Sequence, residues 1–182
     1  MTRTGWSPLL RLVVGAALLG WLSSPLQPAL HAQSVPSASD TPEHWEFRAA
    51  ISWLELDPRK GSSIGSEFSF VRDRPLFWRL QPLGGVVVST IGQGFAYGGL
   101  GLTLAMNERI EIRPSVAAGY YSRGAGPELG SRLEFRSALS IEAALTRNLA
   151  LSMFVYHLSN GGLGVRNPGL EALGLGLTVP LR

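Results

Sequence analysis

Long segments in which apolar and polar residues alternate with a period of two constrain the fold of this chain more than any other feature. Every second residue from Ile110 to Tyr120 is apolar, and the residues between them include Glu111 and Arg113. Such alternation is typical of β-strands with two different faces. No stretch of residues 45–182 shows an apolar stripe of helical period and length. This part of the chain is therefore predicted to be all-β.

The alternating segments number about eight, and turn-forming residues such as Asn167-Pro168-Gly169 separate several of them. The expected strands are residues 45–57, 63–73, 76–90, 95–106, 108–121, 132–145, 148–159 and 170–181. Eight antiparallel strands can close into a barrel whose narrow interior is filled by side chains.

The polar face of these segments decides between a membrane barrel and a soluble β-protein. It carries glycine, serine, threonine and charges of both signs, such as Glu134, Arg136 and Glu142, which could pair inside a narrow lumen. The segments also suit a tilted membrane crossing of about 9–11 residues better than the roughly 5–6 residues usual in soluble sheets. We expect an eight-stranded antiparallel outer-membrane β-barrel with its apolar face toward lipid. A secreted β-sandwich or lipocalin-like barrel is the alternative.

Aromatic side chains near the expected strand ends could form girdles at the two membrane interfaces. These are Trp45, Trp53, Trp78, Tyr97, Tyr120, Tyr121 and Tyr156.

Residues 1–32 have the features of a secretory signal peptide. A basic start and an apolar run over residues 12–22 precede a plausible cleavage site after Ala32. The run is shorter than the roughly 20 residues of a membrane-spanning helix; a retained N-terminal anchor is the alternative. Residues 33–44, rich in Ser, Pro and Ala, are expected to be an unstructured leader to the barrel domain of residues 45–182.

Charge and composition argue against several functions. The chain has 16 Lys and Arg against 13 Asp and Glu, and removal of the predicted signal peptide takes away two arginines and no acid. The nearly neutral remainder argues against nucleic-acid binding, which needs a clustered basic face. There is no cysteine, and only His44 and His157 lie beyond the signal peptide, so a zinc site has almost no ligands. We expect neither a metal nor a cofactor.

One histidine lies within an expected strand. His157 shares the parity of Val155 and therefore belongs to the apolar face, as does Ser159. If the last two strands form a hairpin with its tip near Gly164, Glu171 lies opposite His157 on that face. Polar groups on a lipid-facing surface are costly, which favours a functional role. The alternative is that they lie near the interface and only hydrogen-bond the adjoining loop.

These residue types are those that acyl transfer uses. Ser159 could attack an ester carbonyl, His157 could accept the hydroxyl proton, and Glu171 could orient the imidazole and stabilise its charge. Asn160 carries an amide donor that could stabilise the oxyanion. Arg166, in the adjoining loop, is either an ordinary solvated arginine or a contact for a phosphate or acidic group.

The segment around this site reads His157-Leu158-Ser159-Asn160-Gly161-Gly162, followed by Asn167-Pro168-Gly169-Leu170-Glu171. It resembles the C-terminal signature of the lipid A 3-O-deacylases, the PagL family. In that family a histidine, a serine two residues on and a glutamate fourteen residues after the histidine form the catalytic triad. His157, Ser159 and Glu171 match this spacing, and Asn160 matches as well.

The resemblance implies a cofactor-independent esterase that removes the ester-linked 3-hydroxyacyl chain at position 3 of lipid A. Its partner would be the lipopolysaccharide of the outer leaflet, and the protein would lie in the Gram-negative outer membrane after signal-peptide-directed export. A homodimer is left open. Two other functions also remain open, namely a non-enzymatic small barrel of adhesin or structural kind and another lipid A acyl-modifying enzyme, such as a palmitoyltransferase.

Overall fold

The computed structural model describes residues 44–57 and 61–181, and its regular elements are β-strands. Among the described residues, no helix is long and apolar enough to cross a membrane. The predicted signal peptide and residues 33–43 of the predicted leader lie outside the described residues. His44, the last residue of that leader, accepts a hydrogen bond at 3.0 Å from the peptide N–H of Asp73.

The described strands follow the predicted order. They are β1 (Trp45–Leu54), β2 (Ser63–Arg72), β3 (Leu80–Ser89), β4 (Gly94–Leu102), β5 (Leu104–Ala105), β6 (Ile110–Ser122), β7 (Leu133–Thr146), β8 (Leu149–Ser159) and β9 (Leu170–Leu181). β4 and β5 together correspond to one predicted strand, because both pair with β6 on either side of Thr103.

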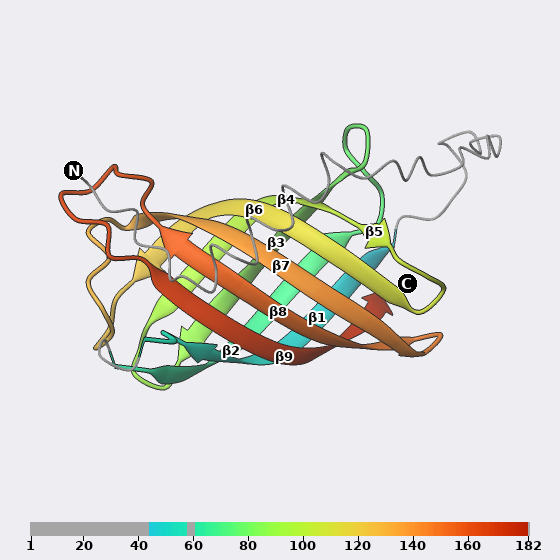
Figure 1. The fold of residues 1–182 in the computed structure, drawn as a ribbon, viewed down its shortest axis with the longest axis horizontal. Coiled ribbons are helices and arrows are strands. Elements are labelled where there is room, and N and C mark those ends of the chain that lie inside the picture. Colours follow the sequence, from blue (N-terminus) through green and yellow to red (C-terminus); the bar gives the residue numbers. More distant parts are fainter. Residues whose placement is uncertain (1–43, 58–60, 182) are drawn as a thin grey trace. The chain divides into compact units, whose positions relative to one another are not determined.

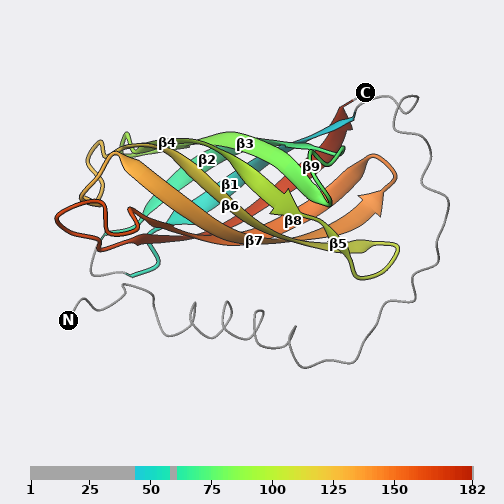
Figure 2. The ribbon, with the colours of Figure 1, turned by 90° about the horizontal axis from the view of Figure 1, so that it is seen from above.

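The strands form a closed barrel (Figures 1 and 2). Strands that follow each other in sequence pair antiparallel, and β1 also pairs with β9, which closes the sheet. The prediction of an eight-stranded antiparallel barrel is confirmed. The end with the connections 90–93, 123–132 and 160–169, at the left of Figure 1, is called the loop end. The opposite end, where Trp45 pairs with Leu181, is called the turn end.

The largest departure from the predicted strand boundaries is at the start of the third strand, and the first strand also ends at Leu54 instead of residue 57. Residues 76–79 were expected within the third strand, but β3 begins at Leu80. The peptide N–H of Leu80 donates to the carbonyl oxygen of Phe77 at 2.9 Å, and Trp78 has a positive φ of 54°. This tight turn replaces the extended backbone that the sequence pattern indicated.

The two faces of the strands differ as predicted. Outward residues such as Ile51, Val116 and Leu175 are apolar and exposed, whereas inward residues such as Glu67 and Arg136 are buried. The polar face therefore lines the interior and the apolar face forms the outer wall, which is the arrangement of membrane barrels.

Buried ion pairs fill the middle of the interior. Arg48 and Arg136 both contact Oε1 of Glu67, at 3.0 and 3.3 Å. The hydroxyl of Tyr97 donates to the same oxygen at 2.8 Å. The guanidinium of Arg136 also lies 4.3 Å from the ring centroid of Tyr156. These contacts connect strands on opposite sides of the barrel. The predicted pairing of charges inside a narrow lumen is confirmed for Arg136 and Glu142, but wrong for Glu134, whose buried carboxylate has no hydrogen-bond partner among the described residues.

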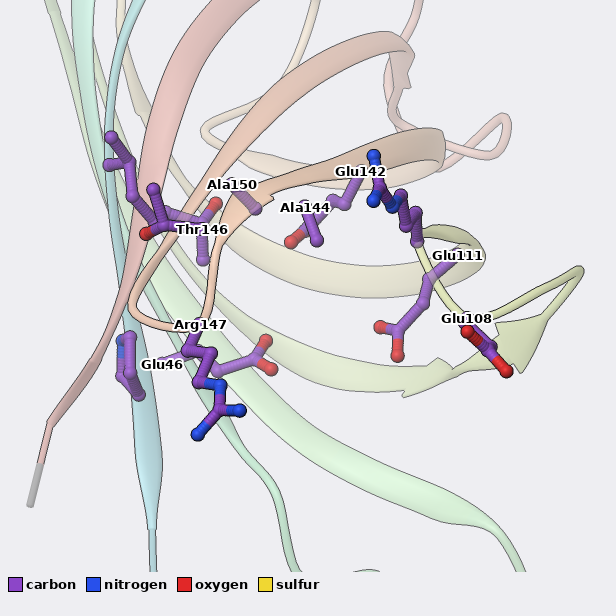
Figure 3. Close-up of a pocket in the computed structure, with 12 residues that line it drawn as sticks. Glu46, Glu108, Glu111, Glu142, Ala144, Thr146, Arg147 and Ala150 are labelled. Carbon is purple, nitrogen blue, oxygen red and sulfur yellow. The ribbon is translucent and has the colours of Figure 1, made fainter.

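Toward the turn end the interior widens into a cavity of about 240 Å³ (Figure 3). Charged side chains dominate its lining, among them Glu46, Glu142 and Arg147. Arg113 pairs with three of the lining carboxylates, at 2.8 Å from Glu46, 2.9 Å from Glu142 and 3.8 Å from Glu111. Water therefore has room at this end of the barrel.

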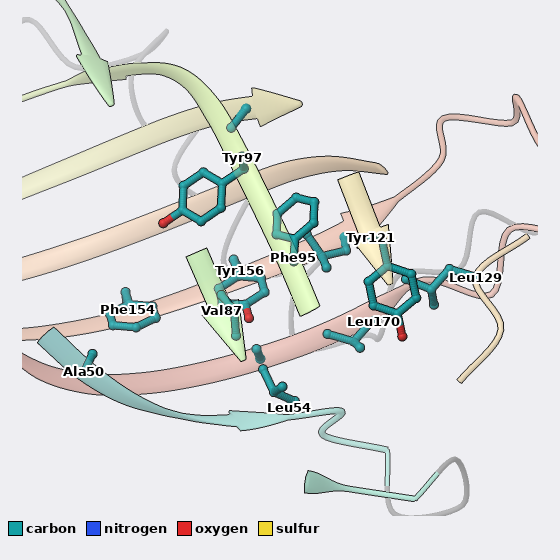
Figure 4. Close-up of a cluster of buried hydrophobic side chains, with 13 residues drawn as sticks. Ala50, Leu54, Val87, Phe95, Tyr97, Tyr121, Leu129, Phe154, Tyr156 and Leu170 are labelled. Atoms are coloured by element: carbon teal, nitrogen blue, oxygen red, sulfur yellow. The ribbon is translucent and has the colours of Figure 1, made fainter. Parts of the chain in front are cut away.

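Toward the loop end the interior is packed with apolar side chains (Figure 4). The cluster includes three tyrosines, Tyr97, Tyr121 and Tyr156, which the sequence pattern placed in an interfacial girdle. That expectation is wrong for these three, because their parity turns them into the barrel. Small residues make room for them, since a Cβ on Gly119 would lie 2.8 Å from Cβ of Tyr97. The other four aromatic residues of the predicted girdle are exposed, namely Trp45, Trp53, Trp78 and Tyr120.

Candidate active site

His157 and Glu171 lie opposite each other on neighbouring strands near the loop end. His157 on β8 and Glu171 on β9 are direct partners in the antiparallel register. Both have the parity of outward residues, so both belong to the outer wall, like Leu173 two residues after Glu171. The predicted hairpin geometry is thus confirmed, and it brings a carboxylate and an imidazole within side-chain reach.

The pair faces outward but is covered by the β8–β9 connection. Only 3% of His157 and 9% of Glu171 is exposed. Gly169 lies against the imidazole, because a Cβ added to it would be 2.6 Å from Cε1 of His157. Gly169 also has a φ of +68°, a conformation that residues with a Cβ rarely adopt. A glycine at this position therefore lets the loop close over the histidine ring.

Ser159 is the last residue of β8 and has the same parity as His157. It pairs with Phe135 of β7 and is half-buried. Residues two apart on a strand are separated by about 7 Å along it. The hydroxyl therefore lies on the same face as the imidazole, at the point where the strand gives way to the loop.

Ser137 is a second hydroxyl close to His157 that the sequence interpretation missed. It lies on β7 directly opposite His157 in the register and is half-buried. Directly opposed residues of an antiparallel pair have Cβ atoms about 4.5–5.5 Å apart. His157 is thus flanked by Glu171 on one side and Ser137 on the other. The register of the preceding hairpin, had it been worked out as for the last one, would have revealed this serine.

Asn160 occupies a different place from the one that an oxyanion donor needs. Its side chain is fully buried and its Nδ2 donates to the carbonyl oxygens of Leu129, at 2.8 Å, and Arg166, at 2.7 Å. Its Oδ1 accepts a hydrogen bond at 2.9 Å from the peptide N–H of Gly162. Both amide hydrogens are therefore engaged, and Asn160 ties the two long connections of the loop end together. Arg166 contributes its carbonyl oxygen to this contact.

Glu55, another residue that the sequence interpretation missed, fixes the start of β9. Its peptide N–H donates at 2.7 Å to the carbonyl oxygen of Glu171. Glu55 is buried and has a positive φ of 65°, so the chain leaves β1 at this point. The backbone that carries Glu171 is thereby held from the β1 side as well as by its pairing with β8.

The arrangement offers the groups that nucleophilic acyl transfer uses: a carboxylate beside an imidazole, with hydroxyls on the same face. Within residues 44–57 and 61–181, no group of three His, Cys, Asp or Glu side chains is placed to hold a metal ion.

Several solved structures share this fold. The crystal structure of the outer membrane enzyme PagL matches with a TM-score of 0.60 and 16% identity, over 75% of this chain and 99% of that chain. A de novo designed transmembrane β-barrel matches with a TM-score of 0.55 and 12% identity, over 78% and 98%. Ail, the attachment invasion locus protein of Yersinia pestis, matches with a TM-score of 0.50 and 10% identity, over 78% and 100%. At these identities the matches show the fold, that of outer-membrane barrels.

No curated protein sequence matches the chain. The family model described as lipid A 3-O-deacylase (PagL) does match, over residues 77–180. The matched region is more than half of the chain and contains Ser137, His157, Ser159 and Glu171. The chain therefore belongs to the lipid A 3-O-deacylase (PagL) family.

Proposed function

We propose that this protein is an outer-membrane esterase that hydrolyses the ester-linked 3-hydroxyacyl chain at position 3 of lipid A. The observation that carries the proposal is the pairing of His157 with Glu171 on the outer wall, beside a serine at the strand end. Family membership supports lipid A deacylation, and the family and the barrel fold support an outer-membrane location. Export would depend on the predicted signal peptide.

In the proposed reaction Ser159 is the nucleophile and His157 the general base. The Ser159 hydroxyl attacks the ester carbonyl carbon while its proton passes to the imidazole. The tetrahedral intermediate then collapses, the bond to the sugar oxygen breaks, and that oxygen takes the proton from His157. Water, activated by the same imidazole, releases the fatty acid from the acyl-enzyme. Glu171 orients the ring and compensates the positive charge that it carries in between.

The developing oxyanion needs a donor, and we assign it to the peptide N–H of Gly161. Of the three peptide N–H groups after Ser159, that of Asn160 donates to Asn167 Oδ1 at 3.1 Å and that of Gly162 donates to Asn160 Oδ1 at 2.9 Å. Within the described part of the chain, no hydrogen bond engages that of Gly161. Asn160 then acts as a positioning residue, because it holds the turn that presents this N–H.

The outward position of the site suits a substrate that lies in the membrane. Lipid A in the outer leaflet can reach the outer wall by lateral diffusion, without entering the barrel. The covering loop carries two exposed apolar side chains, Leu163 and Val165, which would contact acyl chains at the same level.

The decisive experiment is mass spectrometry of lipid A from Gram-negative cells that express the wild-type protein, Ser159→Ala or Ser137→Ala. We expect wild type to remove one 3-hydroxyacyl chain, Ser159→Ala to remove none, and Ser137→Ala to retain most of the activity. All three proteins must be shown to fold in the outer membrane.

Each of the other possible outcomes would point to a different nucleophile or a different function. Loss of activity in Ser137→Ala alone would move the nucleophile to β7. A gain of acyl mass would identify an acyltransferase. Unchanged lipid A with folded wild-type protein would leave a non-enzymatic barrel.

A further inference from the structure

The two longest connections of the loop end carry an excess of positive charge beside the candidate active site. The charged side chains of the two longest connections, 123–132 and 160–169, are Arg123, Glu128, Arg132 and Arg166. Arg123 and Glu128 form an exposed ion pair at 3.0 Å. The hydrogen bond from Arg123 lowers the pKa of the Glu128 carboxyl, so this pair is neutral as a unit. Arg132 and Arg166 remain as cations.

Arg132 is held on the outer wall by contacts that leave its charge uncompensated. Its Nη1 donates to the hydroxyl of Tyr120 at 3.1 Å, and the guanidinium carbon lies 6.0 Å from the centre of the Tyr120 ring. Its carbonyl oxygen accepts a hydrogen bond at 2.7 Å from the peptide N–H of Tyr121. Among the described residues, no carboxylate pairs with it. The position is therefore fixed while the guanidinium stays exposed and available to an anion.

The strand register places this guanidinium near Ser159. Tyr120 pairs with Leu133, and Phe135, two residues further along β7, pairs with Ser159. Tyr120 on β6 is therefore two strands away from Ser159 on β8, a separation of roughly 10 Å across the sheet. Along the strand direction the two residues are offset by two residues, or roughly 7 Å. All of these side chains point outward. A sugar headgroup lying on the outer wall can span this separation.

We propose that Arg132, steered by Tyr120, binds a phosphate group of the glycolipid substrate while the ester faces Ser159. This inference rests on the proposed function and adds to it the part of the substrate that is recognised. Lipid A is a phosphorylated glucosamine disaccharide, so the ester and the phosphates belong to one rigid headgroup. Guanidinium groups bind phosphate through charge-assisted hydrogen bonds. Arg132 is then a specificity-determining residue that sets which lipid is held and in which orientation.

The test compares bisphosphorylated lipid A with lipid A from which the phosphates have been removed, in neutral detergent micelles. The variants are Arg132→Gln, Arg132→Lys and, as a matched control, Arg123→Gln, whose arginine is already paired with Glu128. With wild type we expect KM to be roughly tenfold higher for the phosphate-free lipid, the worth of one charge-assisted hydrogen bond at a partly exposed site. Arg132→Gln should raise KM for the phosphorylated lipid by a similar factor and leave kcat within about twofold.

Two further expectations separate recognition from a structural role. Arg132→Gln should have no effect on the phosphate-free lipid, and Arg132→Lys should recover part of the discrimination, because it keeps the charge but loses the planar fork. Arg123→Gln should behave as wild type on both lipids.

Equal KM values of wild type for the two lipids would overturn the inference, as would an equal rise for both in Arg132→Gln. Phosphatidylglycerol added to the micelles should not restore the KM for phosphate-free lipid; if it does, Arg132 senses an anionic surface and the inference is wrong. Binding of both lipids to Ser159→Ala, with and without Arg132→Gln, is measured in parallel and needs no turnover. The phosphate contact is therefore tested even if wild type hydrolyses neither lipid, an outcome that would contradict the proposed function alone.

Discussion

Two polar groups on opposite faces of the same barrel wall differ in what surrounds them. On the inner face Oε1 of Glu67 receives hydrogen bonds from Arg48, Arg136 and Tyr97. On the outer face His157 and Glu171 pair beneath a loop, and Ser159 stands half-buried at the edge. The inner group is enclosed by the barrel, whereas Ser159 of the outer group is partly exposed at the strand end.

This difference indicates that stability and chemistry are divided between alternate residues of the same strands. A charged group buried in the interior is costly unless it is paired, so the inner residues are constrained by folding. The outer residues lie apart from that interior network of charges, so their residue types can meet the needs of the proposed reaction. Substitutions on the inner face should therefore change the free energy of unfolding, and those on the outer face should change turnover.

The largest effect expected from a single conservative change is that of Glu171→Gln. The amide keeps the shape of the carboxylate but no longer stabilises the protonated imidazole of His157. We expect kcat to fall by about 1000-fold or more, as for the orienting carboxylate of other serine-based triads. Deacylation of purified lipid A is the measurement, and the free energy of unfolding should stay within about 1 kcal/mol of wild type. Full activity of this variant would remove Glu171 from the mechanism.

The inner counterpart is Glu67→Leu, which leaves Arg48 and Arg136 buried without a carboxylate. We expect a loss of about 3–5 kcal/mol in the free energy of unfolding, measured by denaturant titration in lipid vesicles. The matched control is Glu142→Gln, because Arg113 keeps Glu46 at 2.8 Å. The control should lose only about 1 kcal/mol. Equal losses in the two variants would contradict the idea that Glu67 alone neutralises its two arginines.

Gly169→Ala should moderately lower both the rate of deacylation and the free energy of unfolding. A positive φ costs a residue with a Cβ roughly 1–2 kcal/mol, and the new methyl group would displace the imidazole of His157. We expect activity to fall by roughly 10- to 100-fold, because catalysis is sensitive to a displacement of about 1 Å. Gly162→Ala is the control, since its φ is +86° but a Cβ there meets nothing within 4 Å. That variant should share the loss of stability and keep activity within about threefold of wild type.

The smallest effect is expected for Thr178→Val. Thr178 lies on the inner face of β9, and its hydroxyl has no hydrogen-bond partner among the described residues. Replacement of an unsatisfied buried hydroxyl by a methyl group should change the free energy of unfolding by no more than about 0.5–1 kcal/mol, toward greater stability. Both unfolding and deacylation assays should show a protein close to wild type, and a clear loss of activity would contradict the separation of the two faces.

The parts of the fold that depend on strand parity could be predicted from the sequence. Alternation placed Arg136 and Glu142 inside and Ile110 outside, and one hairpin assumption placed Glu171 beside His157. Both inferences need only local geometry. The two faces of a strand decide which side chains point inward, and the assumed tip of the last hairpin decides which residues lie opposite each other.

The rest depended on contacts between distant strands. Tyr97 carries the parity of inward residues but was assigned to the girdle by residue type, since Gly119, the interior glycine that makes room for it, lies beside it only in the closed barrel. Asn160 likewise shares the inward parity of Leu158, yet its partner Leu129 lies in another connection. The position of Ser137 opposite His157 could be predicted only from the register of a second hairpin, between β7 and β8.

The outward site beneath the β8–β9 connection has a kinetic consequence for the proposed reaction. An enzyme that meets its substrate only within a bilayer or micelle responds to the mole fraction of lipid A at the surface, not to its bulk concentration. Inert detergent added at constant lipid A would slow turnover by surface dilution. In a cell, the rate would follow the packing of the outer leaflet, so that conditions which crowd or loosen lipopolysaccharide would regulate deacylation without any change in the protein itself.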